Sequence, residues 1–187
     1  MGDEGESSDV RGAERRALDE FISGRQIRES VVRYCRAVDR NERDAIAAEY
    51  HPDGVDDHGL GAEVPGEQWA DACMLRDRTR AYVHHLGQSL IEVFGDDAFA
   101  ETYWVAYQAW TEGERRYLRT RGGRYADWFQ RREGVWKVFV RRVVDDWSKV
   151  EEVDRVIEDA SVHAAAPYPD DPTYLLRRQI IESAHRA

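Results

Sequence analysis

The sequence predicts an α+β fold, a cone-shaped barrel of a curved, mostly antiparallel sheet that is covered by three N-terminal helices. Apolar residues recur at helical spacing in three segments between residues 23 and 80, whereas from about residue 82 the period changes to the two-residue alternation of strands. The turn signals Gly95-Asp96-Asp97 and Glu133-Gly134 divide this second half into long segments. Helices followed by a meander of strands indicate a sheet with one covered face.

Capping signals and helical periodicity predict the three helices. Ser23 and Gln26 form a capping box at the start of a first long helix, which ends at Asp39. A short second helix is expected over residues 44–50, and a third over residues 65–80, where a proline occupies the first position.

Period-two alternation predicts one short strand and four long ones. The short strand, Val55 to His58, follows the turn signal His51-Pro52-Asp53-Gly54. The hairpin over residues 111–116 is expected to be wider than the other two. The long strands are expected near residues 82–94, 97–111, 117–131 and 135–147.

The two ends of the chain differ from the segment between them. Residues 1–16 are charged and almost free of apolar side chains, so we expect a flexible tail before a domain that spans residues 17–148. Residues 149–187 form a C-terminal extension with a weak helix around 150–157, a proline-rich crossing over 167–172 and another helix from Thr173. This extension could be a lid or an arm that contacts a neighbouring subunit.

Composition excludes several classes of protein. The chain has 37 acidic and 27 basic residues and a net charge of −10, which disfavours binding to nucleic acid. It has no run of 18 apolar residues and a polar, acidic N-terminus, so we expect neither a membrane partner nor export. Cys35 and Cys73 lack the spacing of metal ligands or of a disulfide framework, and the cytoplasm is the expected location.

Three segments carry a family resemblance. They are RYCRAVDRNERDAIAAEYHPDGVDDHG, HHLGQSLIEVFGDDAFAETYWVAY and GGRYADWFQRREGVWKV, the last followed by DDW. In this order and spacing, residues 25–148 resemble the SnoaL-like branch of the nuclear transport factor 2-like superfamily. The resemblance implies a cone-shaped pocket with an Asp–His dyad, as in the dehydratases and dehydrochlorinases of this branch. The superfamily also includes binding proteins and non-catalytic subunits, so the fold alone does not determine the function.

The resemblance places the dyad at Asp39 and His84, and it adds Tyr34, five residues before the aspartate. Glu92, eight residues after His84, favours His84 over its neighbour as the histidine of the dyad. The ordinary pKa of histidine, about 6.5, suits a general base, and a carboxylate on the far ring nitrogen would orient the ring. The alternatives are a solvated acid at a helix end and a hydrogen-bonded core histidine.

Strand alternation extends the expected site, because every second side chain faces the same way. Phenol and guanidinium groups could hold a carbonyl or a leaving hydroxyl, and the resemblance places Tyr125, a catalytic candidate, and Arg141 on the pocket side. Alternatively, the aromatic side chains could simply fill the cone. The expected substrate-binding residues are Tyr50, Asp56, His58, Tyr82, Tyr103, Val105, Tyr107, Asp127, Phe129 and Arg141.

Two further patterns resemble functional sites but have simpler structural explanations. Asp56, Asp57 and His58 are of metal-ligand type, but three ligands within three residues cannot easily converge from a strand, so no metal is expected. The charged run Arg115-Arg116 and Arg119-Arg121 could recognise an anion, although a solvated strand edge protected by charge is the simpler interpretation.

We therefore expect a cofactor-independent lyase, in particular a dehydratase of a hydrophobic or aromatic alcohol such as a polyketide, steroid or phenolic metabolite. An isomerase or cyclase could use the same dyad. A protein of a different class, a small-molecule-binding protein or a subunit like the small subunit of aromatic-ring dioxygenases, would have no use for Asp39 and His84 together. We also expect a homodimer or homotrimer that associates through the outer sheet face, because tryptophans on both faces would otherwise expose an apolar patch.

Overall fold

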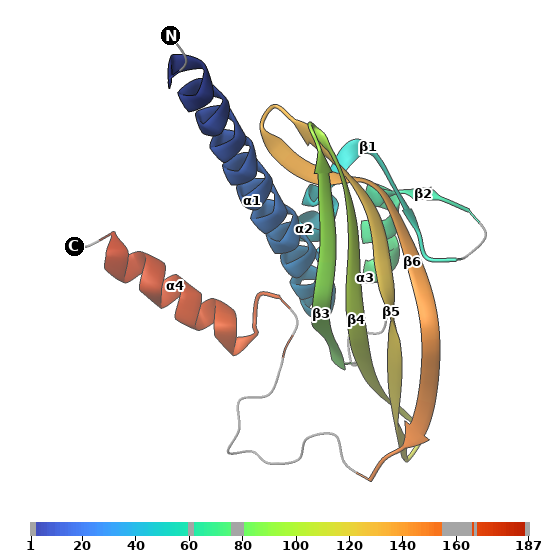
Figure 1. Cartoon of the computed structure of the whole chain (residues 1–187). Helices are drawn as coiled ribbons and strands as arrows, with labels where there is room; N and C mark the ends of the chain where they lie inside the picture. The colour runs from blue at the N-terminus through green and yellow to red at the C-terminus, as the bar shows by residue number, and fades with distance from the viewer. Residues whose placement is uncertain (1–2, 60–61, 76–80, 155–165, 167, 186–187) are drawn as a thin grey trace.

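A curved sheet with helices on one face forms the centre of the molecule (Figure 1). The computed structural model describes residues 3–59, 62–75, 81–154, 166 and 168–185. Within these ranges the sheet has six strands in the order β2-β1-β6-β5-β4-β3, with β1 and β6 parallel and the other neighbours antiparallel. This arrangement confirms the predicted α+β class with a mostly antiparallel, curved sheet.

The four long strands lie close to their predicted positions. Gly95, Glu133 and Gly134 have positive φ angles in two of the hairpin turns. The expected wide hairpin over 111–116 is instead a tight turn, because Glu112 pairs with Arg115 around Gly113, whose φ is 62°. The strands are β1 (Tyr50–Asp57), β2 (Val64–Pro65), β3 (Ala81–Phe94), β4 (Asp97–Glu112), β5 (Arg115–Arg132) and β6 (Val135–Glu152).

Three strand assignments differ from the prediction, since the two-residue strand β2 was not expected and the bounds of β1 and β6 differ. β1 begins at Tyr50, five residues before the expected start, because its first residue already pairs with Val138 of β6. β6 continues through residues 150–152, where a weak helix was expected, since these residues pair with residues 117–119 of β5. The rest of that expected helix, from residue 155, lies outside the described residues.

The first helix is much longer than predicted. α1 runs from Asp3 to Arg40, so most of the residues expected to form a flexible tail are helical. Ser23 does not cap its start but lies buried within it. The segment before Ser23 is rich in Ala, Glu, Arg and Leu, which favour a helix, and Asp19 forms an ion pair with Arg131 of β5. The helix therefore continues past the internal capping signal.

The other two N-terminal helices are short. α2 (Arg43–Ala48) and α3 (Gly66–Met74) cover the same side of the sheet as α1 (Figure 1). The expected end of the third helix, over residues 76–80, lies outside the described residues. The helices bury an apolar core against the sheet; its members include Ile27, Val31, Ile46, Trp69, Phe129 and Val138.

The predicted C-terminal helix is present as α4 (Pro172–Ala184), which lies apart from the sheet (Figure 1). Asp171 caps it by accepting a hydrogen bond from the Thr173 amide at 3.0 Å, and it forms an ion pair with Arg40 of α1 at 3.1 Å. α4 is therefore attached to the sheet-covering helices at its first turn. No helix in the described residues is long and apolar enough to cross a membrane.

Candidate functional site

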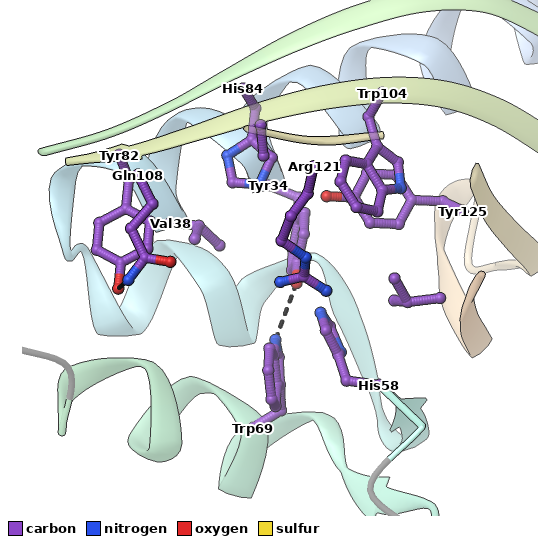
Figure 2. Close-up of a pocket in the computed structure, with 12 residues that line it drawn as sticks. Tyr34, Val38, His58, Trp69, Tyr82, His84, Trp104, Gln108, Arg121 and Tyr125 are labelled. Atoms are coloured by element: carbon purple, nitrogen blue, oxygen red, sulfur yellow. Dashed lines mark hydrogen bonds between the residues drawn. The ribbon is translucent and has the colours of Figure 1, made fainter. Parts of the chain in front are cut away.

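A cavity of about 240 Å³ lies between the inner face of the sheet and the helices α1 and α3 (Figure 2). Five residues expected at the site line it, and they come from three different elements and from the residue that follows β1. These five are Tyr34 of α1, His58, Tyr82 and His84 of β3, and Tyr125 of β5. The cavity is thus the place where the sequence-predicted residues converge.

Asp39 and His84 meet at the wall of this cavity. Asp39 lies in the last turn of α1, and its Oδ1 atom is 2.5 Å from Nδ1 of His84, while its Oδ2 accepts the His84 main-chain N–H at 3.0 Å. These contacts compensate a negative charge at a helix C-terminus. The His84 side chain is 11% exposed and that of Asp39 12%. The carboxylate therefore fixes the ring and leaves Nε2 as the ring nitrogen available to a bound molecule.

The neighbouring histidine lies on the other side of the sheet. His85 packs edge-on against Tyr107 with 5.6 Å between the ring centroids, on the face turned away from α1. His84, and not His85, thus lines the cavity.

Two tyrosine hydroxyls lie close to the dyad. Tyr34 accepts a hydrogen bond from Nε1 of Trp69 at 2.8 Å, and the hydroxyl of Tyr125 accepts one from the Cys35 thiol at 3.8 Å. Burial raises the pKa of both hydroxyls, with a further contribution from Asp56 at Tyr34 and from Cys35 at Tyr125. Both phenols therefore keep their protons at neutral pH and remain hydrogen-bond donors.

A second histidine–carboxylate pair lies at the end of β1. Nδ1 of His58 contacts Oδ1 of Asp56, and Oδ2 of the same carboxylate accepts a hydrogen bond from Tyr50 at 2.5 Å. The ring of His58 stacks on Trp69 of α3 with 3.7 Å between centroids. Asp56 and Tyr50 are buried, so they support His58 but do not line the cavity.

Arg141 and Asp127 form a buried ion pair beneath the cavity. Nε and Nη2 of Arg141 donate to the two Asp127 oxygens at 2.8 and 2.7 Å, and both side chains are fully buried. The guanidinium lies against the rings of Tyr34 and Tyr125, 4.1 and 4.4 Å from their centroids. Burial raises the pKa of Asp127, and the Arg141 charge opposes this rise.

Several expected substrate-binding residues therefore lie in the core. Asp56, Asp127 and Phe129 do face inward as strand alternation predicted. These three residues, together with Tyr50 and Arg141, are buried where α1 packs on β6 and α3 packs on β1. The cavity occupies only the neighbouring section of the inner face, and strand parity alone does not distinguish the two sections.

The expected positions of Tyr103, Val105 and Tyr107 are wrong, because all three face outward. The register set at the hairpin pair Phe94–Asp97 would place His84 opposite Tyr107. A bulge between Leu86 and Ser89 shifts the pairing by one residue, so His84 lies opposite Ala106. A one-residue shift exchanges the two faces of the partner strand. Trp104, Ala106 and Gln108 therefore line the cavity instead.

The helix α1 supports this bulge. Arg28 donates hydrogen bonds to the carbonyl of Gly87 at 3.0 Å and to the Ser89 hydroxyl at 2.7 Å. A Cβ at Gly87 would lie 3.3 Å from Cβ of Tyr103, so the glycine permits a close approach of the two strands. Gly87 was the available sequence signal, since a glycine within a strand often marks a bulge.

Arg121 is the main site residue that sequence reasoning misplaced. It was interpreted as part of a charged strand edge, but its guanidinium enters the cavity between Tyr34 and His58 (Figure 2). Asp145 of β6 holds it through contacts of 2.7 and 2.6 Å from Nη2 to the two carboxylate oxygens. Trp69, Trp104, Val38, Ala106, Gln108 and Val143 complete the lining. Among the described side chains, no group of three His, Cys, Asp or Glu residues could hold a metal ion.

Comparison with known proteins identifies relatives of this chain. A family model described as "SnoaL-like domain" matches residues 20–142. A putative scytalone dehydratase from Novosphingobium aromaticivorans is 17% identical, with a TM-score of 0.59 over 80% of this chain and 95% of that one. No curated protein sequence matches the chain.

Two further solved structures share the fold. A type 2 hexachlorocyclohexane dehydrochlorinase is 16% identical, with a TM-score of 0.66 over 78% of this chain and 99% of that one. A protein of unknown function from Mycobacterium tuberculosis is 21% identical, with a TM-score of 0.62 over 91% and 93%. At these identities the similarity concerns the fold.

Proposed function

The chain belongs to the SnoaL-like family, and on that premise we propose that it is a cofactor-independent lyase, a dehydratase of a hydrophobic or aromatic alcohol. One observation supports this most: a carboxylate holds a cavity-lining histidine by one ring nitrogen, which is the arrangement a general base requires. A histidine that only stabilised the core would have no need of a cavity beside it.

In the proposed reaction His84 removes a proton from a carbon that is activated by a neighbouring carbonyl. Nε2 takes the proton, and the Asp39 carboxylate at Nδ1 stabilises the imidazolium that forms. The electrons of the broken C–H bond pass to the carbonyl oxygen and then form the C=C bond as the hydroxyl on the adjacent carbon departs.

Three donors are placed to stabilise the oxyanion that forms between these steps. Tyr34 and Tyr125 keep their protons, and Arg121 adds a positive charge at the centre of the cavity. Arg121, rather than Arg141 as expected, thus supplies the guanidinium that stabilises the oxyanion. Arg141 instead positions the two phenols from below.

The walls favour a compact aromatic substrate. Trp69 and Trp104 give flat apolar surfaces, and Tyr82 and Gln108, which are hydrogen-bonded to each other at 2.9 Å, give a polar end. A volume of about 240 Å³ is below the usual range of ligand pockets, roughly 300–1,000 Å³. This size suits a one- or two-ring compound better than a four-ring steroid. Among the structural relatives, one is named a putative scytalone dehydratase and another a hexachlorocyclohexane dehydrochlorinase.

The test is a screen of β-hydroxy ketones and cyclic β-hydroxy carbonyl compounds. Product formation is measured as the rise in absorbance of the enone. His84→Ala should lower the rate about 100-fold to 10,000-fold, the usual contribution of a general base. Asp39→Asn should also lower it strongly while the fold is retained. His85→Gln, on the outer face, is the matched control and should keep the wild-type rate. Full activity in His84→Ala would exclude His84 as the base, and loss of wild-type activity on addition of a chelator would indicate a metal-dependent reaction. Conversion of none of these compounds by the wild-type protein would leave a ligand-binding function as the better explanation.

A further inference from the structure

The cavity is bordered by two histidines, each held by a carboxylate. His84 enters it from the sheet, and His58 enters it from the end of β1, beside α3 (Figure 2). In each pair the carboxylate contacts Nδ1, so in both rings Nε2 is the nitrogen far from the carboxylate. A molecule bound in a cavity of about 240 Å³ would lie between them.

The His58 ring is held more firmly than a substrate-contacting side chain requires. Trp69 stacks on one face at an interplanar angle of 20°, and Asp56 fixes the ring plane through Nδ1. Asp56 is itself fixed by the Tyr50 hydroxyl at 2.5 Å. Tyr50, Asp56 and His58 thus form a hydrogen-bonded chain from the core to the cavity wall.

A third histidine shows what a structural role looks like in this fold. His51, also buried, bonds through Nε2 to the main-chain carbonyl of Gln130 at 2.9 Å and does not line the cavity. It completes the hydrogen bonding of the sheet. His58, by contrast, has a buried carboxylate on one side and the cavity on the other.

The buried charges near His58 favour its charged form. Two carboxylates, Asp56 and Asp127, lie in this part of the core with one buried guanidinium, Arg141. A second guanidinium, that of Arg121, reaches the cavity beside His58, but Asp145 balances its charge. Asp127 interacts electrostatically with both Asp56 and His58. A protonated His58 would balance the remaining negative charge, and a buried charge without a partner is strongly unfavourable.

We propose that His58 is a second proton-transfer residue, which protonates the leaving hydroxyl after His84 has removed the C–H proton. This inference rests on the proposed lyase function. As the C–O bond breaks, the proton on His58 passes to the departing oxygen, water leaves, and the C–H electron pair becomes the C=C bond. His58 ends neutral and His84 ends protonated, so one proton transfer through solvent restores the starting state.

The proposal predicts a dependence on the leaving group. Hydroxide must be protonated to leave, whereas chloride leaves without a proton. The experiment therefore compares two compounds with one carbon skeleton, 4-hydroxy-4-phenylbutan-2-one and 4-chloro-4-phenylbutan-2-one, by the rate of enone formation above the spontaneous background. The variants are His58→Gln, Asp56→Asn and His84→Gln, with His85→Gln as the control.

For His58→Gln we expect a loss of about 100-fold or more with the hydroxy compound and less than about 5-fold with the chloro compound, from the usual size of acid catalysis. Asp56→Asn should show the same selectivity to a smaller degree, because it changes no cavity-lining side chain. His84→Gln should lose both activities, since both need the base.

The outcomes separate the two proposals. If His58→Gln and Asp56→Asn lose both activities equally, or neither, while His84→Gln loses both, His58 is not the acid although the lyase proposal stands. If His84→Gln keeps the chloro activity, or if the wild-type protein converts neither compound nor any other tested pair, the lyase proposal fails and this one fails with it.

Discussion

The inner and outer faces of the sheet carry similar side chains with different surroundings. On β4, Trp104 faces inward and is 4% exposed, whereas its neighbour Tyr103 faces outward and is 40% exposed. On β3, His84 contacts a carboxylate in the cavity and His85 packs against an exposed tyrosine. Residue type alone therefore does not identify a site in this fold; the site is determined by which face each residue occupies. Variants on the two faces should behave differently.

The largest effect is expected at the buried ion pair of the inner face. Arg141→Met removes the guanidinium and leaves Asp127 buried without its partner, which should lower the free energy of unfolding by about 3–5 kcal/mol. Denaturant unfolding at neutral pH measures this change. The double variant Asp127→Asn, Arg141→Met should recover much of the loss, because no buried charge then remains. An equal loss of unfolding free energy in the single and double variants would show that lost packing, and not the unpaired charge of Asp127, causes the destabilisation.

A second comparison uses adjacent residues of β4. Trp104→Ala removes a large buried side chain that stacks on Tyr125, and should cost about 3 kcal/mol. Tyr103→Ala should change stability by about 0.5 kcal/mol or less, as is usual for exposed positions. Thermal unfolding of the two variants checks the difference. A greater loss in Tyr103→Ala would contradict the register shift at the bulge.

These two residues also show what the sequence can and cannot predict. Alternating periodicity located the long strands within a few residues, and the dyad followed from a family resemblance. The face of β4 was assigned wrongly because the bulge between Leu86 and Ser89 is stabilised by Arg28, which is 59 residues from Gly87 in the sequence. Likewise the position of Arg121 depends on its ion pair with Asp145 of the adjacent strand. Such contacts are non-local, and strand periodicity carries no information about them.

The outer face should act in association between copies of the chain. Phe99, Tyr103, Tyr107, Trp128 and Trp147 are exposed there, and an apolar surface of this kind favours contact with a partner. We expect a homodimer or homotrimer at micromolar concentration. Trp147→Ser should weaken it without loss of the fold, because Trp147 is half-exposed. Light scattering over a dilution series measures the oligomeric state of the wild-type protein and of Trp147→Ser. A monomeric wild-type protein would contradict the expectation.

The smallest expected effect concerns the thiol of Cys35 beneath Tyr125. Burial raises the pKa of this thiol from its ordinary 9.0 to about 12. At pH 8 only about one thiol in 10,000 would be ionised, so alkylation by iodoacetamide should be negligible in the folded protein. The unfolded chain ionises first as the pH rises, so this group should reduce stability above about pH 9. Mass spectrometry after labelling at pH 8 and 10 tests this, and rapid labelling at pH 8 would contradict it.

The most direct test of the proposed base needs no substrate. In the neutral ring of His84 the proton must lie on Nδ1, toward Asp39, if Nε2 is to accept a proton in the cavity. Long-range ¹H–¹⁵N NMR of protein with labelled histidines reports the tautomer, and the spectrum of His84→Gln assigns the signal. We expect a neutral ring protonated at Nδ1, and a change in this signal in Asp39→Asn. A neutral His84 that carries its proton on Nε2 would contradict its role as the base.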